Sequence, residues 1–110
     1  MATKIENLDD LKNIDGGILM IHNGASPEAN YALYGTLKDM DSDLITLWNT
    51  LSLYKDGTVK GRLTSSKKVS GIDFSNPDAV MAFLKRSEFE RREKATYSLK
   101  RMDHWQIYVE

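Results

Sequence analysis

The chain has 110 residues and a mass of 12.5 kDa, which fits one domain spanning residues 1–110. Its 41% hydrophobic and 28% charged residues exclude a disordered tail, a collagen-like fibre and a repeat array. The absence of cysteine excludes disulfides, thiolate metal sites and a cysteine nucleophile, and the net charge of −1 excludes a strongly basic or acidic chain.

The two halves of the chain carry opposite charge. Residues 1–50 hold three basic and eight acidic side chains, whereas residues 51–110 hold twelve basic and eight acidic ones. Such asymmetry fits a folded domain whose two halves neutralise each other, and it also fits an interaction surface. Opposite halves of two copies could also close a symmetric homodimer. The chain shows no basic, apolar leader and no long apolar run, so we expect a cytoplasmic protein without a membrane segment.

The N-terminal residues predict a short helix followed by a buried strand. Within residues 5–14, three apolar side chains recur at the spacing of one helix face: Leu8, Leu11 and Ile14. Gly16-Gly17 ends that helix. Residues 17–22 then predict a central strand, because they hold four consecutive apolar residues and the turn Asn23-Gly24 follows.

Alternating residues predict a second strand over residues 30–38, where tyrosine and threonine also favour extended backbone. Ser26-Pro27-Glu28, just before it, predicts at most a single helical turn. Residues 39–43, with three aspartates, predict a polar loop.

Residues 44–54 fit two patterns. A helix would align Leu44, Leu47, Trp48 and Leu51, and a strand would align Ile45, Leu47, Leu51 and Leu53, with only Asn49 out of phase. The turn Lys55-Asp56-Gly57 favours the strand, since a three-residue hairpin loop pairs Leu53 with Val59 and Leu51 with Gly61. This register places three side chains together on the other face: Tyr54, Lys60 and Arg62.

Residues 64–71 predict a polar, basic linker. Asn76-Pro77-Asp78 predicts the start of the main helix, with the asparagine as its cap. The buried stripe of that helix consists of Val80, Phe83 and Leu84. The apolar phase breaks near Ser87, so either a second helix starts there or Phe89 is exposed.

The clean alternation of residues 104–109 predicts a C-terminal strand that pairs with residues 97–101 and leaves a free edge for another sheet. The elements together predict an α+β fold: a mostly antiparallel sheet of five or six strands, with a short N-terminal helix and one main helix at about residues 76–87 packed on it.

Known catalytic and metal-binding patterns are not evident. His22 and His104 are far apart in sequence, and the aspartates at 39, 41 and 43 lack the glycine and glutamate of a calcium loop. No nucleophile or phosphate-loop motif is present. We therefore expect no enzyme, no metal and no cofactor. The alternative, an enzyme that uses these aspartates with a metal, predicts thermal stabilisation by magnesium or manganese.

Basic side chains interleaved with aromatic rings are the sharpest feature. A helix over residues 85–100 would project one group, the helix set, to one side: Lys85, Arg86, Phe89, Arg92 and Lys100. A second group, the strand set, consists of Tyr54, Lys60, Arg62, Lys67 and Lys68. Cations and rings bind phosphates and bases, and arginine and aromatic residues also anchor protein interfaces. Interleaved glutamates equally fit a solvated helix with ion pairs.

Residues 35–47, GTLKDMDSDLITL, and residues 59–63, VKGRL, resemble the two short motifs of Sm-like RNA-binding barrels. The resemblance covers roughly half the chain. Ile45 stands where that family has a base-contacting asparagine, and the C-terminal 45 residues have no counterpart, so no site residue is carried over.

From these features we expect a small non-enzymatic binding protein, regulatory or inhibitory, that captures a protein partner through the helix set. The positive charge of that set would suit an acidic partner. The alternative is binding of single-stranded nucleic acid, RNA or DNA, through the strand set and the same helix face. Affinity that falls steeply with added salt would favour the nucleic acid.

Overall fold

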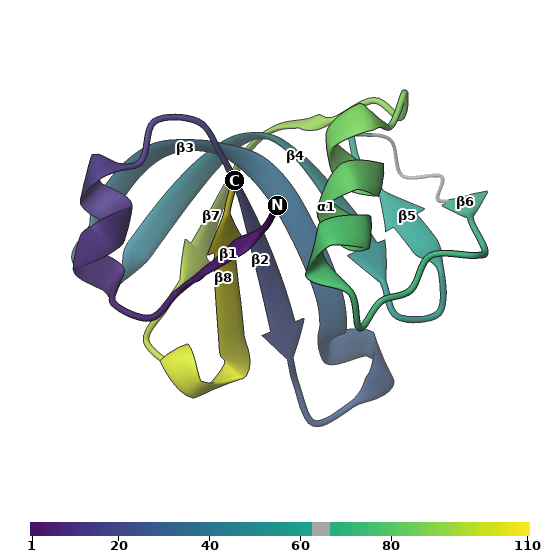
Figure 1. The fold of residues 1–110 in the computed structure, drawn as a ribbon, viewed down its shortest axis with the longest axis horizontal. Coiled ribbons are helices and arrows are strands. Elements are labelled where there is room, and N and C mark those ends of the chain that lie inside the picture. The colour runs from purple at the N-terminus through teal and green to yellow at the C-terminus, as the bar shows by residue number, and fades with distance from the viewer. Residues whose placement is uncertain (63–66) are drawn as a thin grey trace.

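A computed structural model describes residues 1–62 and 67–110. Within these residues, the chain forms an antiparallel sheet of eight strands, one α-helix and three short 3-10 helices (Figure 1). The strands are β1 (Thr3–Ile5), β2 (Gly17–Asn23), β3 (Asn30–Asp41), β4 (Leu44–Tyr54), β5 (Thr58–Lys60), β6 (Lys67–Lys68), β7 (Arg92–Ser98) and β8 (Trp105–Val109). The helices are η1 (Leu8–Asn13), η2 (Pro27–Ala29), α1 (Pro77–Arg86) and η3 (Met102–His104).

The sheet runs in the order β1-β8-β2-β3-β4-β5-β6, and β7 also pairs with β4. One edge of β4 is therefore shared: β7 pairs with its Leu44–Thr50 half, and β5 pairs with Ser52 and Leu53. Figure 1 shows β3 and β4 arching over the other strands, with η1 toward one end of the arch and α1 toward the other. This curvature leaves a buried cluster on each face of the sheet.

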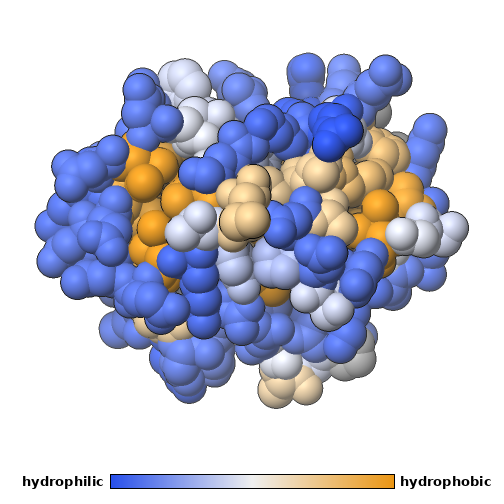
Figure 2. All heavy atoms as spheres, in the orientation of Figure 1, coloured by the Kyte–Doolittle hydropathy of each residue, from blue (hydrophilic) through white to orange (hydrophobic). Residues whose placement is uncertain are grey.

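The first cluster lies between the sheet and α1, and its buried residues are Leu19, Ile21, Ala32, Leu51, Leu53, Val59, Val80, Met81 and Leu84. The second lies on the opposite face, partly under η1, and its buried residues are Leu11, Ile18, Met20, Leu33, Ile45, Leu47, Leu99 and Ile107. Hydrophobic residues are visible at two places in Figure 2, toward the η1 end and toward the α1 and β5 end. The burial of β2 on both faces confirms the prediction of a central strand.

A β-bulge at Asn49 makes β4 contribute to both clusters. The pairing shifts from Tyr34↔Leu51 to Thr36↔Trp48, so β4 carries one extra residue, and Asn49 takes up a positive φ of 56°. Ile45 and Leu47 therefore face the second cluster, whereas Leu51 and Leu53 face the first. The prediction that the apolar residues of 45–53 share one face is wrong. The extra residue at Asn49 reverses which face of the sheet the following side chains point to.

The β4–β5 hairpin confirms the predicted register. Leu53 pairs with Val59, Ser52 pairs with Lys60, and Gly57 has the positive φ, 94°, that a three-residue loop requires. Leu53 and Val59 are buried under α1, so the side chains of Ser52 and Lys60 lie on the opposite face.

The predicted N-terminus of the main helix is confirmed. The Asn76 side chain accepts hydrogen bonds from the backbone N–H groups of Asp78 and Ala79, and α1 begins at Pro77. Its buried residues are Val80, Met81 and Leu84, while Phe83 is only partly buried.

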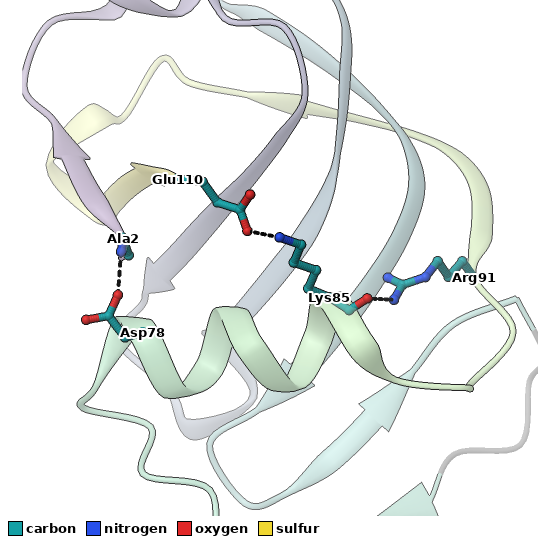
Figure 3. A network of polar contacts seen from close by, with 5 residues as sticks. All are labelled: Ala2, Asp78, Lys85, Arg91 and Glu110. Carbon is teal, nitrogen blue, oxygen red and sulfur yellow. Dashed lines mark hydrogen bonds and ion pairs between the residues drawn. The ribbon is translucent and has the colours of Figure 1, made fainter.

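Polar contacts hold both ends of α1 (Figure 3). The Ala2 N–H donates to Asp78 at the start of the helix, and Lys85 pairs with Glu110 near its end. The hydrogen bond to Glu110 raises the pKa of Lys85. The Arg91 guanidinium donates to the carbonyl oxygens of Leu84, Lys85 and Ser87, which the helix leaves unpaired. Arg91 therefore caps the helix, and the chain leaves it at Ser87 with extended backbone.

Several sequence predictions are corrected. The described residues hold eight strands rather than five or six, because residues 92–98 form β7 and the short segments β1 and β6 also pair. Residues 39–41 extend β3 rather than forming a loop. Of the predicted linker, residues 64–66 lie outside the described residues, and Lys67–Lys68 form β6.

The predicted partner and free edge of the C-terminal strand are also wrong. β8 lies between β1 and β2, with both of its edges paired, and β7 pairs with β4 instead. Among the helices of the described residues, none has the length and apolar character to cross a membrane.

Candidate functional site

A pocket of about 480 Å³ lies where β3, β4, β5 and β7 meet, on the sheet face opposite α1. We call it the tyrosine–arginine pocket. Its lining residues are Tyr31, Thr50, Ser52, Tyr54, Lys60, Gly61, Arg62, Arg92 and Tyr97. The volume falls within the range of pockets that hold small molecules or parts of larger ligands.

A row of three rings leads to this pocket, and two of them, Tyr31 and Tyr54, line it. His22, Tyr31 and Tyr54 are neighbours across β2, β3 and β4. Ring centroids lie 5.4 Å apart for His22 and Tyr31 and 5.2 Å apart for Tyr31 and Tyr54, with interplanar angles of 30° and 31°. Trp105 supports the row from the side, because its ring meets Tyr31 edge-on at 6.0 Å. Tyr54 is therefore the outermost ring of a braced stack.

The outer ring is covered by a cation. The Lys60 ammonium lies 4.8 Å from the Tyr54 ring centroid, a cation–π contact that an exposed lysine can leave at small cost. A planar ligand that displaces the ammonium would extend the row of rings by one.

Positive charge in the pocket is uncompensated. Lys60, Arg62 and Arg92 all line it, the lining includes no carboxylate, and none of the three forms an ion pair within the described residues. Residues 63–66 are Leu-Thr-Ser-Ser and hold no acid. The pocket therefore favours an anion.

Close packing of Gly61 against the segment before β7 brings two of these cations together. The Arg62 N–H donates to the Glu90 carbonyl oxygen at 3.0 Å, and a Cβ at Gly61 would lie 1.9 Å from that oxygen. Only glycine permits this approach, which places Arg62 near the start of β7, where Arg92 lies.

Two tyrosine hydroxyls stay protonated in the pocket. Burial raises the pKa of Tyr31 to about 12, with smaller contributions from Tyr97 and Tyr54. Burial also raises the pKa of Tyr97, against the opposing effect of Arg92. Both hydroxyls are therefore neutral at physiological pH and can donate hydrogen bonds to an anion.

Alkaline titration of tyrosine absorbance should show a component near pH 12 that Tyr31→Phe removes. Since the folded-state pKa exceeds the ordinary value of 10.0, the stability due to neutral Tyr31 is complete below pH 10 and is lost as the pH rises towards 12. Tyr31→Phe should flatten this loss, measured by urea unfolding between pH 9 and about 11.5. Persistence of the pH 12 component in the variant would contradict the assignment.

Part of the strand set comes together as predicted. Tyr54, Lys60 and Arg62 line the same pocket. Lys67 and Lys68 do not, because β6 lies beyond β5, and Lys68 pairs with Asp56 at 3.7 Å.

The prediction of one helix over residues 85–100, which would carry the helix set, is wrong. α1 ends at Arg86, and Arg92 begins β7. Lys100 lies past the other end of that strand, which is itself roughly 20 Å long at strand rise. Phe89 is not an uncovered ring, because it packs against the first cluster. Of the set, Arg92 lines the pocket, and Lys85 is engaged with Glu110. Partner binding by Lys85, Arg86, Phe89, Arg92 and Lys100 stays a prediction.

Five residues of the pocket were not predicted as site residues from the sequence: Tyr31, Thr50, Ser52, Gly61 and Tyr97. Thr50 and Ser52 follow the bulge at Asn49, which a count of alternating residues does not locate. Tyr97 was assigned to a strand beside residues 104–109, although the alternation of Ala95, Tyr97 and Leu99 was a usable signal.

The two histidines approach each other, with ring centroids 5.9 Å apart, and the His22 Nδ1 lies 2.6 Å from the Ala29 carbonyl oxygen. Residues 1–62 and 67–110 contain no group of three histidine or carboxylate side chains that could hold a metal ion.

Comparison of the chain with protein-family models, curated proteins and solved structures finds no match. The resemblance of residues 35–47 and 59–63 to Sm-like barrels stays a prediction.

Proposed function

We propose that this chain binds single-stranded nucleic acid in the tyrosine–arginine pocket. The observation that carries the proposal is the convergence of three cations, which form no ion pair within residues 1–62 and 67–110, at the outer end of a braced row of aromatic rings. A nucleic-acid strand carries a flat base and an anionic phosphate in each nucleotide. The rings of the pocket suit the base, and its cations suit the phosphate.

The row of rings favours an unpaired base. In a duplex, each base is stacked on both faces, so Tyr54 could reach a base only at a helix end. In a single strand the base is free to take the place of the Lys60 ammonium on the Tyr54 ring. The displaced ammonium can then join Arg62 and Arg92 at the phosphate.

The net charge of −1 does not oppose this function, since the binding charge is local. The lining holds three cations and no acid, so the attraction acts at short range within the pocket. Capture of a protein partner by the helix set remains a separate prediction. The contacts of the described residues support it less directly than they support nucleic-acid binding in the pocket.

Fluorescence anisotropy with a short labelled oligonucleotide tests the proposal, with Tyr54→Ala compared with Trp48→Ala. Trp48 is a matched control, because it is an exposed ring on β4 with the Lys38 ammonium 4.5 Å from its centroid, but it lies outside the pocket. Tyr54→Ala should weaken binding about tenfold through lost stacking, and Trp48→Ala by less than about twofold.

Binding should also weaken as salt is raised, and duplex of the same sequence should bind more weakly than single strand. Equal effects of the two ring variants, or a larger effect at Trp48, would place the contact elsewhere and overturn the proposal.

A further inference from the structure

The charge in the tyrosine–arginine pocket exceeds that of one phosphodiester. Lys60, Arg62 and Arg92 supply three positive charges without a carboxylate in the lining. A phosphodiester carries one negative charge, whereas a terminal phosphomonoester carries about −1.5 to −2 at neutral pH. The monoester balances the pocket more closely.

The lining of the pocket also supplies hydroxyl hydrogen-bond donors beside these cations. Thr50 is buried, with 2% of its surface exposed, and it lines the pocket together with Tyr31 and Tyr97. Because the tyrosine hydroxyls remain protonated, they can donate to the additional oxygen that a terminal phosphate presents.

Beyond Tyr54 lies a second pocket that suits a phosphate less well. A neighbouring pocket of about 630 Å³ shares Tyr54 and Lys60 with the first, but Glu28 and Asp56 also line it. Hydrogen bonds from Thr58 lower the pKa of Asp56, which therefore stays ionised. Two acids against two lysines leave this second pocket close to neutral, so it suits a sugar or base better than a phosphate.

We propose that the site recognises the phosphorylated end of a strand: the terminal phosphomonoester occupies the tyrosine–arginine pocket, and the adjoining base stacks on Tyr54. This inference rests on the proposed function of the same pocket and narrows its ligand from any single strand to one with a terminal phosphate.

The test uses the full chain and one pentanucleotide sequence prepared with a 5′-phosphate, with a 3′-phosphate and with neither. One phosphorylated end should bind about tenfold more tightly than the unphosphorylated strand, the effect expected of added charge-assisted hydrogen bonds. Arg92→Ala should remove this preference while leaving weaker binding of all three strands. A nucleoside 5′-monophosphate is included as a competitor.

The outcomes separate this inference from the proposed function. Equal affinity for the three strands, together with sensitivity to Tyr54→Ala, would overturn the terminal-phosphate inference and leave strand binding intact. Absence of binding by any strand would overturn both. Competition by the monophosphate as strong as the binding of the phosphorylated strand itself would overturn recognition of a strand end, because the pocket would then be a site for a free nucleotide.

Discussion

Replacement of Arg62 and Arg92 by alanine together should lower the affinity for a single strand at least about 100-fold, because each charge-assisted hydrogen bond contributes about 1.5–3 kcal/mol. Both side chains line the pocket, and neither forms an ion pair within the described residues that the substitution would break. The loss should therefore appear in binding and not in stability.

The double variant Lys67→Ala/Lys68→Ala is the matched control, since it removes the same charge from exposed β6, outside the pocket. It should weaken binding only a few-fold. A plot of log affinity against log salt should lose about 1.4 of its slope in the arginine variant, at about 0.7 for each phosphate contact with a single strand. Equal losses of affinity in both double variants would indicate a general effect of positive charge. They would contradict the assignment of phosphate binding to the pocket.

Gly61→Ala should destabilise the fold by about 1–3 kcal/mol, as overpacking does. The new Cβ would lie 1.9 Å from the Glu90 carbonyl oxygen and 3.0 Å from Leu51 Cδ1, so the backbone must separate. Separation breaks the hydrogen bond from Arg62 to Glu90 and widens the pocket. Urea unfolding and oligonucleotide titration should both register the change.

Gly71→Ala is the comparison for that variant. Gly71 has a φ of 82° and open space around its Cβ position, so alanine there strains only the local backbone. It should lower stability and leave affinity unchanged. A Gly61→Ala protein with wild-type stability and wild-type affinity would show that the close approach to Glu90 has no role in the site.

The most accurate predictions from the sequence were those based on turn and helix-cap residues. Asn76-Pro77-Asp78 located the start of α1, and Lys55-Asp56-Gly57 gave the register that brings Tyr54, Lys60 and Arg62 to one face. Both depend on hydrogen bonds and φ angles within a few residues, so the information lies in the sequence itself.

Longer-range features escaped prediction because distant contacts decide them. The charged residues after Arg86 have good helix propensity, but pairing with β4 places residues 92–98 in a strand. The helix ends earlier because Arg91 caps its last carbonyl groups. Neither contact leaves a signal in local spacing.

The pocket could not be predicted without the β-bulge at Asn49. One extra residue at Asn49 turns Thr50, Ser52 and Tyr54 to the face that Ile45 and Leu47 occupy. Gly35 accommodates the bulge, since a Cβ there would lie 2.8 Å from the Thr50 methyl group. Sequence alternation alone predicted a continuous apolar face and so could not assemble this site.

Nuclear magnetic resonance of the isotope-labelled chain, titrated with a 5′-phosphorylated oligonucleotide at low salt, tests strand binding at the pocket most directly. Ring resonances of Tyr31 and Tyr54 and guanidinium resonances of Arg62 and Arg92 should shift together, while those of Trp48 stay unchanged. Shifts confined to α1, to β6 or to the Trp48 face, with the Tyr54 ring unmoved, would contradict the assignment of binding to this pocket.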